Sequence, residues 1–432
     1  MKVLVISNFY PPHHVSGYAL LCCDVMRGLE ARGHEVTVLT STLGVEDETV
    51  EGRVHRVLTL ESPLDFYRPA KALGYPIASR RNVRHVRETV SAVQPDVIFI
   101  WGLWNLSKRV AAEAERLLGA RVVYYLANPW PIEPNRHRAY WSLPARRRGR
   151  EPLKRACRLA ARVWLRSEWH EPTLRFQHAP CCSRALRDQL IAADVPLKNA
   201  PVVYEGIDVE SYVEAGNRRE MPVAGGPLTL LYVGLLVEHK GVHTAVEALR
   251  RLSPATRERV SLTILGSGHP DYESYLRSVV TEMGLEDRVT FVDPIPRREL
   301  PAFLARHHVV VLPSIWEEPL ALIMQEGLAS GAVLVGSATG GTTEIIKDGE
   351  NGLLFAPADA GGLAAQVERL AADPELCRRL AERGRKTAQE AFALDRMASE
   401  LEGLLTRVCA DSETTHHHLS RNAKWRREVL FT

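Results

Sequence analysis

Short apolar runs alternate with helix-length segments along almost the whole chain, and this alternation most constrains the fold. The runs are rich in Val, Ile and Leu and lie at residues 2–7, 35–39, 97–101, 121–126, 228–233, 261–265, 289–292, 309–312 and 333–335. Continuous apolar strands that alternate with helices are typical of parallel sheets covered on both faces. The sequence therefore predicts an α/β protein built from βαβ units.

The runs form two series, separated by a segment with a different composition. Residues 209–227 lose the periodicity and collect Gly, Pro and charged side chains, so we interpret them as a linker. A chain of 432 residues also suits two domains better than one. We expect domains at 1–208 and 228–385. The polar segment 411–432 contains three consecutive histidines and is interpreted as a solvated tail rather than a metal site.

Composition excludes several classes of protein. Apolar residues make up 45% of the chain and charged residues 25%, but no apolar run reaches the roughly 18 residues that a membrane span needs. The first apolar run ends at Asn8, before two prolines, and is interpreted as a strand rather than a signal peptide. Seven cysteines without a C-x-x-C pair indicate reduced thiols without disulfides or structural zinc. These features predict a cytoplasmic protein.

Positive charge is concentrated in one part of the chain. The formal net charge is +3, but residues 136–170 carry eleven Lys or Arg against two Glu. A local patch of this kind argues against a nucleic-acid-binding protein, in which basic residues dominate the domain.

The basic patch contains a predicted amphipathic helix at 151–170. Its basic side chains fall within an arc of about 120° at 100° per residue: Lys154, Arg155, Arg158, Arg162 and Arg166. Small and apolar side chains lie opposite: Ala156, Ala160, Val163 and Trp164. Such a helix suits an anionic membrane surface, with the protein peripheral at the inner face, or an anionic acceptor. A solvated helix whose apolar side covers the domain core is the alternative.

The segment 312–341 carries the most chemical information. Glu318 precedes Pro319, which predicts a helix from Pro319 to about residue 329, and free amides near its start would form an anion site. Glu326 follows eight residues after Glu318, about 12 Å further along such a helix. Two carboxylates at this separation suit two parts of one elongated ligand. The alternatives are a glutamate that stabilises the helix dipole and a solvated glutamate.

Two other loops could meet a phosphate. A predicted strand ends at Gly234, and Lys240 lies on the loop before the next helix, where its alternative is a solvated turn residue. Gly17 opens the helix after the first strand, so its backbone amide could contact an anion. This loop lacks the G-x-G-x-x-G pattern and the acidic residue about 20 positions later, which argues against a dehydrogenase.

Together these segments resemble the family 4 retaining glycosyltransferases, glycosyl transferases group 1 of the GT-B fold, over residues 1 to about 408. The resemblance rests on the motifs RGHEVTVLTS (32–41), PDVIFIWG (95–102), EGID (205–208), GLLVEHKG (234–241), LGSG (265–268), EEPLALIMQE (317–326) and GGTTEII (340–346). It implies two Rossmann-like domains facing across a cleft, with a C-terminal helix at 386–410 returning to the first domain. It also implies transfer of a sugar from a nucleotide-diphosphate donor with retention of configuration.

The resemblance also implies a role for each matching residue. Glu318 would contact the donor sugar, Glu326 the ribose hydroxyls and Lys240 the diphosphate. The other donor-binding positions would be Gly17, Gly234, Pro319, Leu320, Ala321 and Leu322. Cationic and amide donors can stabilise a departing diphosphate without a metal. We therefore expect neither a metal ion nor another cofactor.

Three positions depart from the family pattern. Leu235 stands where the family usually has Arg, and His308 where it usually has Asp. Ala127 and Asn128 stand where it usually has His and then often Asp. We assign Asn128 a catalytic position, although an amide can hydrogen-bond a sugar hydroxyl but cannot act as a base.

The acceptor side is less clearly marked. Candidates for contact with the acceptor are His13, His14, Trp101, Trp104 and Trp130, although the tryptophans equally suit packing under loops. The acceptor would be a glycan, a lipid-linked molecule or a small molecule. Two other functions fit the same motifs: a catalytically weakened protein that binds sugar nucleotides, and a sugar-nucleotide epimerase of the GT-B fold.

Overall fold

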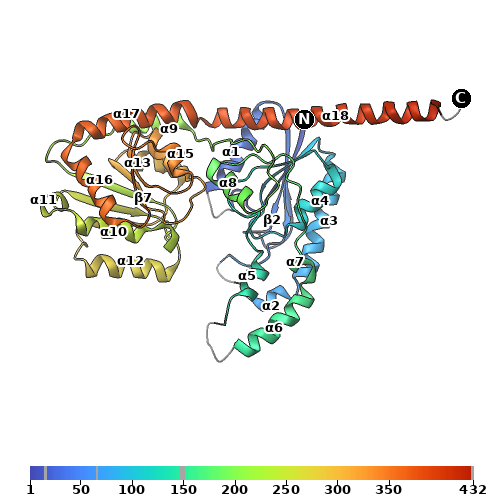
Figure 1. The fold of residues 1–432 in the computed structure, drawn as a ribbon, viewed down its shortest axis with the longest axis horizontal. Helices are drawn as coiled ribbons and strands as arrows, with labels where there is room; N and C mark the ends of the chain where they lie inside the picture. The colour runs from blue at the N-terminus through green and yellow to red at the C-terminus, as the bar shows by residue number, and fades with distance from the viewer. Residues whose placement is uncertain (14–16, 65–66, 146–150, 430–432) are drawn as a thin grey trace. The chain divides into compact units, whose positions relative to one another are not determined.

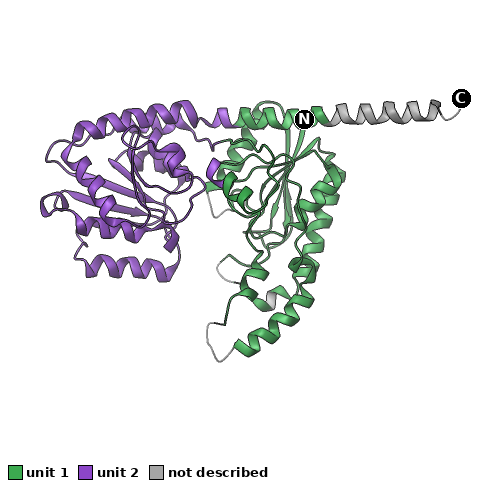
Figure 2. Ribbon diagram, viewed as in Figure 1, with its two compact units in different colours: residues 1–182, 187–203, 398–432 green, residues 183–186, 204–397 purple. Residues whose placement is uncertain are grey.

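The computed structural model describes residues 1–13, 17–64, 67–145 and 151–429, with the backbone alone for residues 70–71 and 412–429. The chain forms two compact units (Figure 2). Unit 1 comprises residues 1–182, 187–203 and 398–432, and unit 2 comprises residues 183–186 and 204–397.

Unit 1 is built on a six-stranded sheet with the order β3-β4-β2-β1-β5-β6. Its strands are β1 (Lys2–Ser7), β2 (Glu35–Ser41), β3 (Thr49–Glu51), β4 (Val54–Leu58), β5 (Val97–Gly102) and β6 (Val122–Tyr124). All neighbouring strands are parallel except β3 and β4. β1 and β5 are almost completely buried, as expected for a central strand covered on both faces.

The helices of unit 1 lie beside this sheet or extend beyond one of its ends (Figure 1). They are α1 (Gly17–Ala31), α2 (Pro69–Ala72), α3 (Tyr75–Val93), α4 (Arg109–Leu118), α5 (Arg136–Ser142), α6 (Glu151–Trp164), α7 (Arg166–Trp169) and most of α8 (Arg184–Ala192). α1 buries its apolar stripe, including Leu21, Val25 and Leu29, and Gly33 with φ 84° follows its end. A left-handed glycine just after a helix is a common stop signal.

Unit 2 has a six-stranded, fully parallel sheet in the order β12-β11-β10-β7-β8-β9. Its strands are β7 (Leu228–Val233), β8 (Val260–Leu265), β9 (Val289–Val292), β10 (Val309–Leu312), β11 (Val333–Ser337) and β12 (Leu353–Phe355). After β7 the chain forms β8 and β9 toward one edge of the sheet, and after β10 it forms β11 and β12 toward the other edge. The loops that follow β7 and β10 therefore diverge at the topological switch point, where open α/β sheets bind their ligands.

The helices of unit 2 are mostly short. They are α9 (Val209–Gly216), α10 (Val242–Arg251), α11 (Pro254–Arg257), α12 (Pro270–Glu282), α13 (Leu300–Leu304), α14 (Leu322–Ala329), α15 (Thr342–Ile345), α16 (Ala360–Ala372) and α17 (Pro374–Ala391), with 3-10 turns η2 (Glu238–Lys240) and η3 (Arg297–Glu299). Valines of β10 and β11 share one buried core with α10 and α16.

The predicted linker at 209–227 is wrong for its first eight residues, which form α9. The Asp208 side chain caps this helix by accepting a hydrogen bond from the Ser211 amide, and Tyr212 is buried. Gly216 lies so close to Ser330 that a Cβ would be 2.0 Å from its carbonyl oxygen. α9 is thus packed into unit 2, and the division between the units falls at residues 203–204.

The single C-terminal helix predicted at 386–410 is instead two helices, α17 and α18 (Leu394–Val429). They are separated by Phe392 and Ala393, because this stretch pairs with residues 206–208 like a short strand. The Ile207 amide donates to the Phe392 carbonyl at 2.8 Å, and the Leu394 amide donates to the Ile207 carbonyl at 2.9 Å. From residue 398 the chain belongs to unit 1, where Glu402 pairs with His34 at 2.6 Å.

Within the part of the chain that the structure describes, no helix combines the length and the apolar character needed to cross a membrane.

Candidate functional site

Two charged side chains meet at the switch point of unit 2. Lys240 lies on η2, which follows β7, and Glu318 lies on the loop that follows β10. The Lys240 Nζ is 2.5 Å from the Glu318 Oε2. Ser314 Oγ and Trp316 Nε1 each donate to the same oxygen at 3.1 Å. These contacts hold a nearly buried carboxylate in one orientation beside a cation.

Gly241 explains why the two loops can approach. It has φ 65°, and a Cβ at this position would lie 2.0 Å from the Pro313 carbonyl oxygen. The neighbouring Ile315 amide donates to the His239 carbonyl at 3.0 Å. Only glycine satisfies both the left-handed backbone and the close contact, so Gly241 fixes where Lys240 stands.

Glu326 is the second buried carboxylate of this region. It lies on α14, is 6% exposed, and its Oε1 accepts a hydrogen bond from the Tyr212 hydroxyl at 2.8 Å. Burial raises the pKa of Glu326, whereas the Tyr212 bond and the charge of Arg297 oppose this rise. Sequence reasoning missed Tyr212 because it lies in the predicted linker; the only local signal was the Asp208 cap three residues before Ser211.

The helix predicted to begin at Pro319 begins at Leu322 instead. Pro319, Leu320 and Ala321 precede it, and Ala321 is extended. The reason lies in the Gly340–Gly341 pair: the Gly341 amide donates to the Glu318 carbonyl at 2.8 Å, which holds the backbone before the helix against this turn. The first helical amides without an intrahelical acceptor are therefore those of Leu322 and Ile323. Of the predicted positions Pro319, Leu320, Ala321 and Leu322, only Leu322 belongs to the first turn of the helix.

The loops that follow β7 and β8 pack backbone to backbone. A Cβ at Gly266 would lie 2.0 Å from the Gly234 carbonyl oxygen, and one at Gly268 would lie 2.1 Å from the Leu236 carbonyl oxygen. These contacts require glycine at 266 and 268, whereas Gly234 has its own reason, a φ of 154° that other residues rarely adopt. Leu235, at the position of the expected Arg, is 53% exposed.

The predicted residues of unit 1 fall into two groups, of which the first is accessible. Gly17 is the exposed first residue of α1, and Asn128 is half-buried with its Oδ1 accepting from the Trp130 amide at 3.2 Å. His13 is half-buried against Gly44, and His14 lies outside the described residues. Trp104 is half-buried, with the Arg136 guanidinium 5.4 Å from the centre of its ring.

The second group is packed in the core. Trp101 is completely buried, stacks on Tyr18 at 5.2 Å, and donates its indole N–H to the Tyr18 carbonyl. Trp130 is 3% exposed and packs against Tyr124 and Phe176. The prediction that Trp101 and Trp130 contact an acceptor is wrong, because both side chains are covered by protein.

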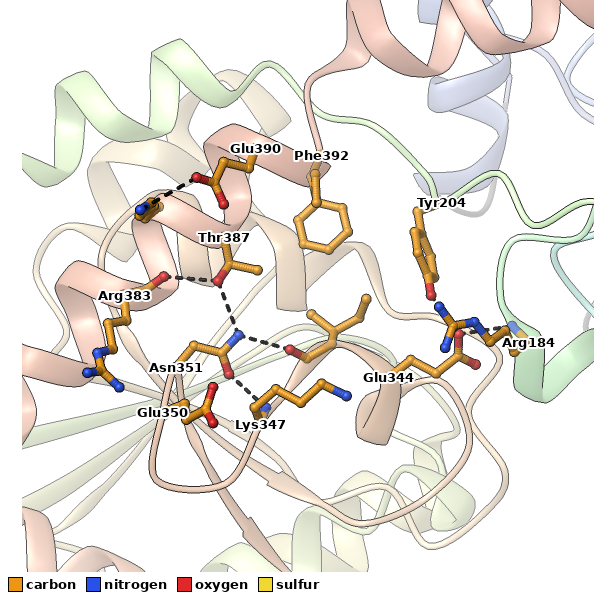
Figure 3. A pocket seen from close by; sticks show the side chains of 13 residues that line it. Arg184, Tyr204, Glu344, Lys347, Glu350, Asn351, Arg383, Thr387, Glu390 and Phe392 are labelled. Carbon is orange, nitrogen blue, oxygen red and sulfur yellow. Dashed lines mark hydrogen bonds and ion pairs between the residues drawn. The ribbon is translucent and has the colours of Figure 1, made fainter.

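A cavity of about 470 Å³ lies elsewhere in unit 2 (Figure 3). Glu344, from the GGTTEII motif, accepts hydrogen bonds there from the Arg184 and Ala185 amides and from the Tyr204 hydroxyl. Glu344 therefore fixes the backbone at 184–185. The cavity lining includes none of Lys240, Glu318 and Glu326.

The described residues include no group of three or more His, Cys, Asp or Glu side chains arranged to hold a metal.

Comparison with known proteins decides the family. Residues 214–387 match the family model of glycosyl transferases group 1, and residues 15–211 match that of glycosyltransferase family 4. Glycogen synthase of Mycobacterium tuberculosis is 30% identical to this chain over 407 residues, which cover 91% of each protein. The chain belongs to the group 1 glycosyl transferases of family 4. The family predicted from the motifs is thereby confirmed.

Other relatives of this glycosyltransferase match over similar lengths. An uncharacterized glycosyltransferase of Methanocaldococcus jannaschii is 25% identical over 410 residues, covering 93% of this chain and 96% of that protein. Sucrose-phosphate synthase from Thermosynechococcus elongatus has a TM-score of 0.71 at 21% identity and covers 95% of this chain and 99% of its own. Anabaena HepE, solved with UDP-glucose, has a TM-score of 0.66 at 19% identity and covers 94% and 100%. The fold is therefore GT-B, as predicted.

Proposed function

We propose that this glycosyltransferase moves a sugar from a nucleotide-diphosphate donor to an acceptor with retention of configuration and without a metal ion. The Lys240–Glu318 pair at the switch point of unit 2 carries this proposal. It places a cation and a hydrogen-bond acceptor side by side where open α/β sheets bind ligands.

Each residue of the site has a defined task in this proposal. Lys240 and the first amides of α14 stabilise the negative charge that grows on the diphosphate as the sugar departs. Glu318, oriented by Ser314 and Trp316, accepts hydrogen bonds from the sugar hydroxyls. Glu326 binds the ribose hydroxyls through Oε2, because Oε1 is already occupied by Tyr212.

Asn128 of unit 1 is assigned to the transferred sugar. Its Oδ1 accepts from the Trp130 amide, which leaves the Nδ2 to donate to a sugar hydroxyl. Because an amide cannot take up a proton at neutral pH, Asn128 orients the sugar and does not act as a general base.

The donor is proposed to be a nucleoside-diphosphate sugar, and UDP-glucose is the first to test, since HepE was solved in complex with it. We expect one nucleotide sugar of a panel to raise the melting temperature of the wild type. A ligand at about 100 times its Kd stabilises by roughly 2.7 kcal/mol. In the Glu326→Gln variant the shift should shrink, because a neutral amide replaces the charged acceptor of the ribose hydroxyls.

Product analysis then tests the chemistry. NMR of the product formed with a suitable acceptor should show the same anomeric configuration as the donor, and activity should survive EDTA. An inverted product or complete loss of activity in EDTA contradicts this part of the proposal. Tight donor binding without hydrolysis or transfer would instead indicate a binding protein.

We further propose that α6 docks the enzyme on an anionic membrane, at the inner face of the cytoplasmic membrane, to reach a lipid-linked acceptor. α6 has no buried residue, so the expectation that its apolar side covers the core is wrong. Leu153, Val163 and Trp164 are 66%, 73% and 57% exposed and lie opposite the basic side chains. An exposed apolar stripe beside a basic one is complementary to an anionic lipid surface.

A further inference from the structure

One cavity of unit 2, of about 570 Å³, has no role in the proposed function, and its lining includes none of Lys240, Glu318 and Glu326. It lies between the loop that follows β7 and the first turns of α10 and α12, two helices that lie next to each other (Figure 1). Its volume is typical of a small-molecule site, which measures about 300–1,000 Å³. The cavity is lined mainly by polar and aromatic side chains: Glu238, His243, His269, Asp271, Tyr272 and Tyr275.

Backbone contacts hold two walls of this cavity together. The Leu236 amide donates to the Ser267 carbonyl at 3.0 Å, so the loop that follows β7 is joined to the loop that follows β8. The His269 amide donates to the Leu236 carbonyl, also at 3.0 Å, which fixes the start of α12 against the same loop. The Gly268 amide donates to the Glu273 side chain at 2.5 Å. A ligand that binds between walls already in place loses less free energy to ordering the protein.

Three rings pack against one another at this cavity. The centres of the Tyr272 and Tyr275 rings are 5.9 Å apart, and the His243 ring lies 6.1 Å from the first and 6.4 Å from the second. A hydrogen bond of 2.8 Å joins the Tyr272 hydroxyl to the His243 Nδ1. Tyr272 is only 9% exposed, whereas Tyr275 is 47% exposed. The cavity therefore presents one accessible ring, which two packed rings support.

The charged side chains that line the cavity determine which ligands it suits. Glu238 and Asp271 are both exposed, and the lining contains no Lys or Arg. Two carboxylates without a cation disfavour an anionic ligand, such as a second nucleotide. A cage for an organic cation needs several accessible ring faces, whereas Tyr272 is nearly buried. An accessible ring beside hydrogen-bond acceptors instead suits a neutral ligand that has both apolar faces and hydroxyl groups.

We propose that this cavity is a carbohydrate-binding site, which binds a neutral oligosaccharide on unit 2. A sugar ring lies on Tyr275, because the C–H groups on the face of a pyranose are apolar and slightly positive, and the face of an aromatic ring is negative. Glu238 and Asp271 accept hydrogen bonds from the sugar hydroxyls. This inference goes beyond the proposed function, because the site requires neither a nucleotide donor nor sugar transfer.

The test is calorimetric titration of the full-length protein, without nucleotide, with maltoheptaose, cellohexaose and chitohexaose. At least one of these oligosaccharides should bind, and Tyr275→Ala should weaken its binding at least about tenfold, because the ring on which the sugar lies is lost. Tyr275→Phe keeps the ring and should bind within about threefold of the wild type. Glu238→Ala combined with Asp271→Ala should weaken binding about tenfold, because two hydrogen-bond acceptors are removed.

Trp164→Ala is the control for binding to an exposed ring elsewhere. Trp164 is also an exposed aromatic residue, but it lies in unit 1. This variant should bind the oligosaccharide as the wild type does. Tyr275→Ala should keep the wild-type melting temperature, UDP affinity and donor hydrolysis, because Tyr275 is exposed and lies outside the proposed donor site.

Three results overturn the proposal. The first is that none of the three oligosaccharides binds, and the second is that Tyr275→Ala binds them as tightly as the wild type does. The third is that tetramethylammonium binds through Tyr275 and the oligosaccharides do not, which would make the cavity a site for cations. A protein that binds an oligosaccharide through Tyr275 but neither hydrolyses nor transfers a donor sugar would contradict the proposed function and leave this site intact.

Discussion

Lys240 has one ionic partner in the described part of the free protein, Glu318, and in the proposed mechanism it gains a second one, the diphosphate of the donor. In the free protein the Lys240 ammonium neutralises a carboxylate that is nearly buried. In the proposed mechanism, negative charge grows on the diphosphate during transfer, and the same ammonium then interacts with that charge more strongly than with the bound donor. Interactions that strengthen in the transition state raise kcat rather than affinity.

Lys240→Met should therefore lower kcat by about 10²–10³-fold and change the KM for the donor much less. Methionine keeps the length of the side chain but leaves Glu318 without its cation, so the melting temperature must be measured alongside the kinetics. The complementary variant Leu235→Arg, at a half-exposed position, should tighten UDP binding. If Lys240→Met leaves both kcat and UDP affinity unchanged, the diphosphate is bound elsewhere.

At the scale of elements, the turn at Gly241 determines the position of Lys240. Gly241→Ala introduces a Cβ at φ 65° that would lie 2.0 Å from the Pro313 carbonyl oxygen, so the two loops must separate. We expect a loss of stability above the roughly 1 kcal/mol typical of a left-handed alanine, together with a large loss of activity. Gly284→Ala is the matched control: φ is 62° and nothing lies within 4 Å of its Cβ. Equal effects of the two substitutions on activity would contradict the role given to Gly241.

The elements also show what the sequence could predict. β1, β7, β9 and β10 have the expected bounds, because β-branched and apolar residues dominate each of these strands and polar or turn-forming residues flank them. β3, β4 and β12 were not predicted. β3 and β12 have only three residues each, which are too few to show a period, and β4 contains His55 and Arg56, which interrupt its apolar run. Lys240 follows β7 and Glu318 follows β10. These two strands are neighbours in the sheet, so the strand order brings the two residues together. The partnership of Tyr212 with Glu326 depends on tertiary packing of α9, which no local pattern encodes.

α6 buries none of its residues, and its apolar side makes one polar contact within the described protein, in which the Trp164 indole donates to the Leu73 carbonyl at 2.8 Å. Replacing Arg158, Arg162 and Arg166 together by Gln should abolish sedimentation with anionic liposomes, because each surface cation contributes about 1 kcal/mol near anionic lipid. Val163→Ser combined with Trp164→Ser should weaken sedimentation with the liposomes while the charge of α6 stays the same. Donor hydrolysis should be unchanged in all variants, and high salt should mimic the loss of the arginines. A wild type that does not sediment with anionic liposomes even at low salt contradicts membrane docking.

At the scale of the whole molecule, the described part of each unit contains a buried acid whose pKa is raised to about 8: Glu61 in unit 1 and Glu205 in unit 2. In the folded state such a group keeps its proton at pH 7, whereas in the unfolded chain it releases the proton above about pH 4.3. The unfolded state therefore binds fewer protons in this range, and the free energy of unfolding falls as pH rises towards 8.

The decline should be visible between about pH 6.5 and about pH 8, at up to roughly 1.4 kcal/mol per pH unit for each acid. Below that window the buried His137, whose pKa is lowered to about 4, acts in the opposite direction, because protonation then favours the unfolded chain. Calorimetric unfolding of Glu61→Gln should show a weaker pH dependence in the stability of unit 1, and Glu205→Gln the same for unit 2. The double variant should show a shallower decline than either single variant, since the two acids lie in separate units and their effects should add. A wild type whose stability rises from pH 6.5 to pH 8 would show that neither acid keeps its proton in the folded state.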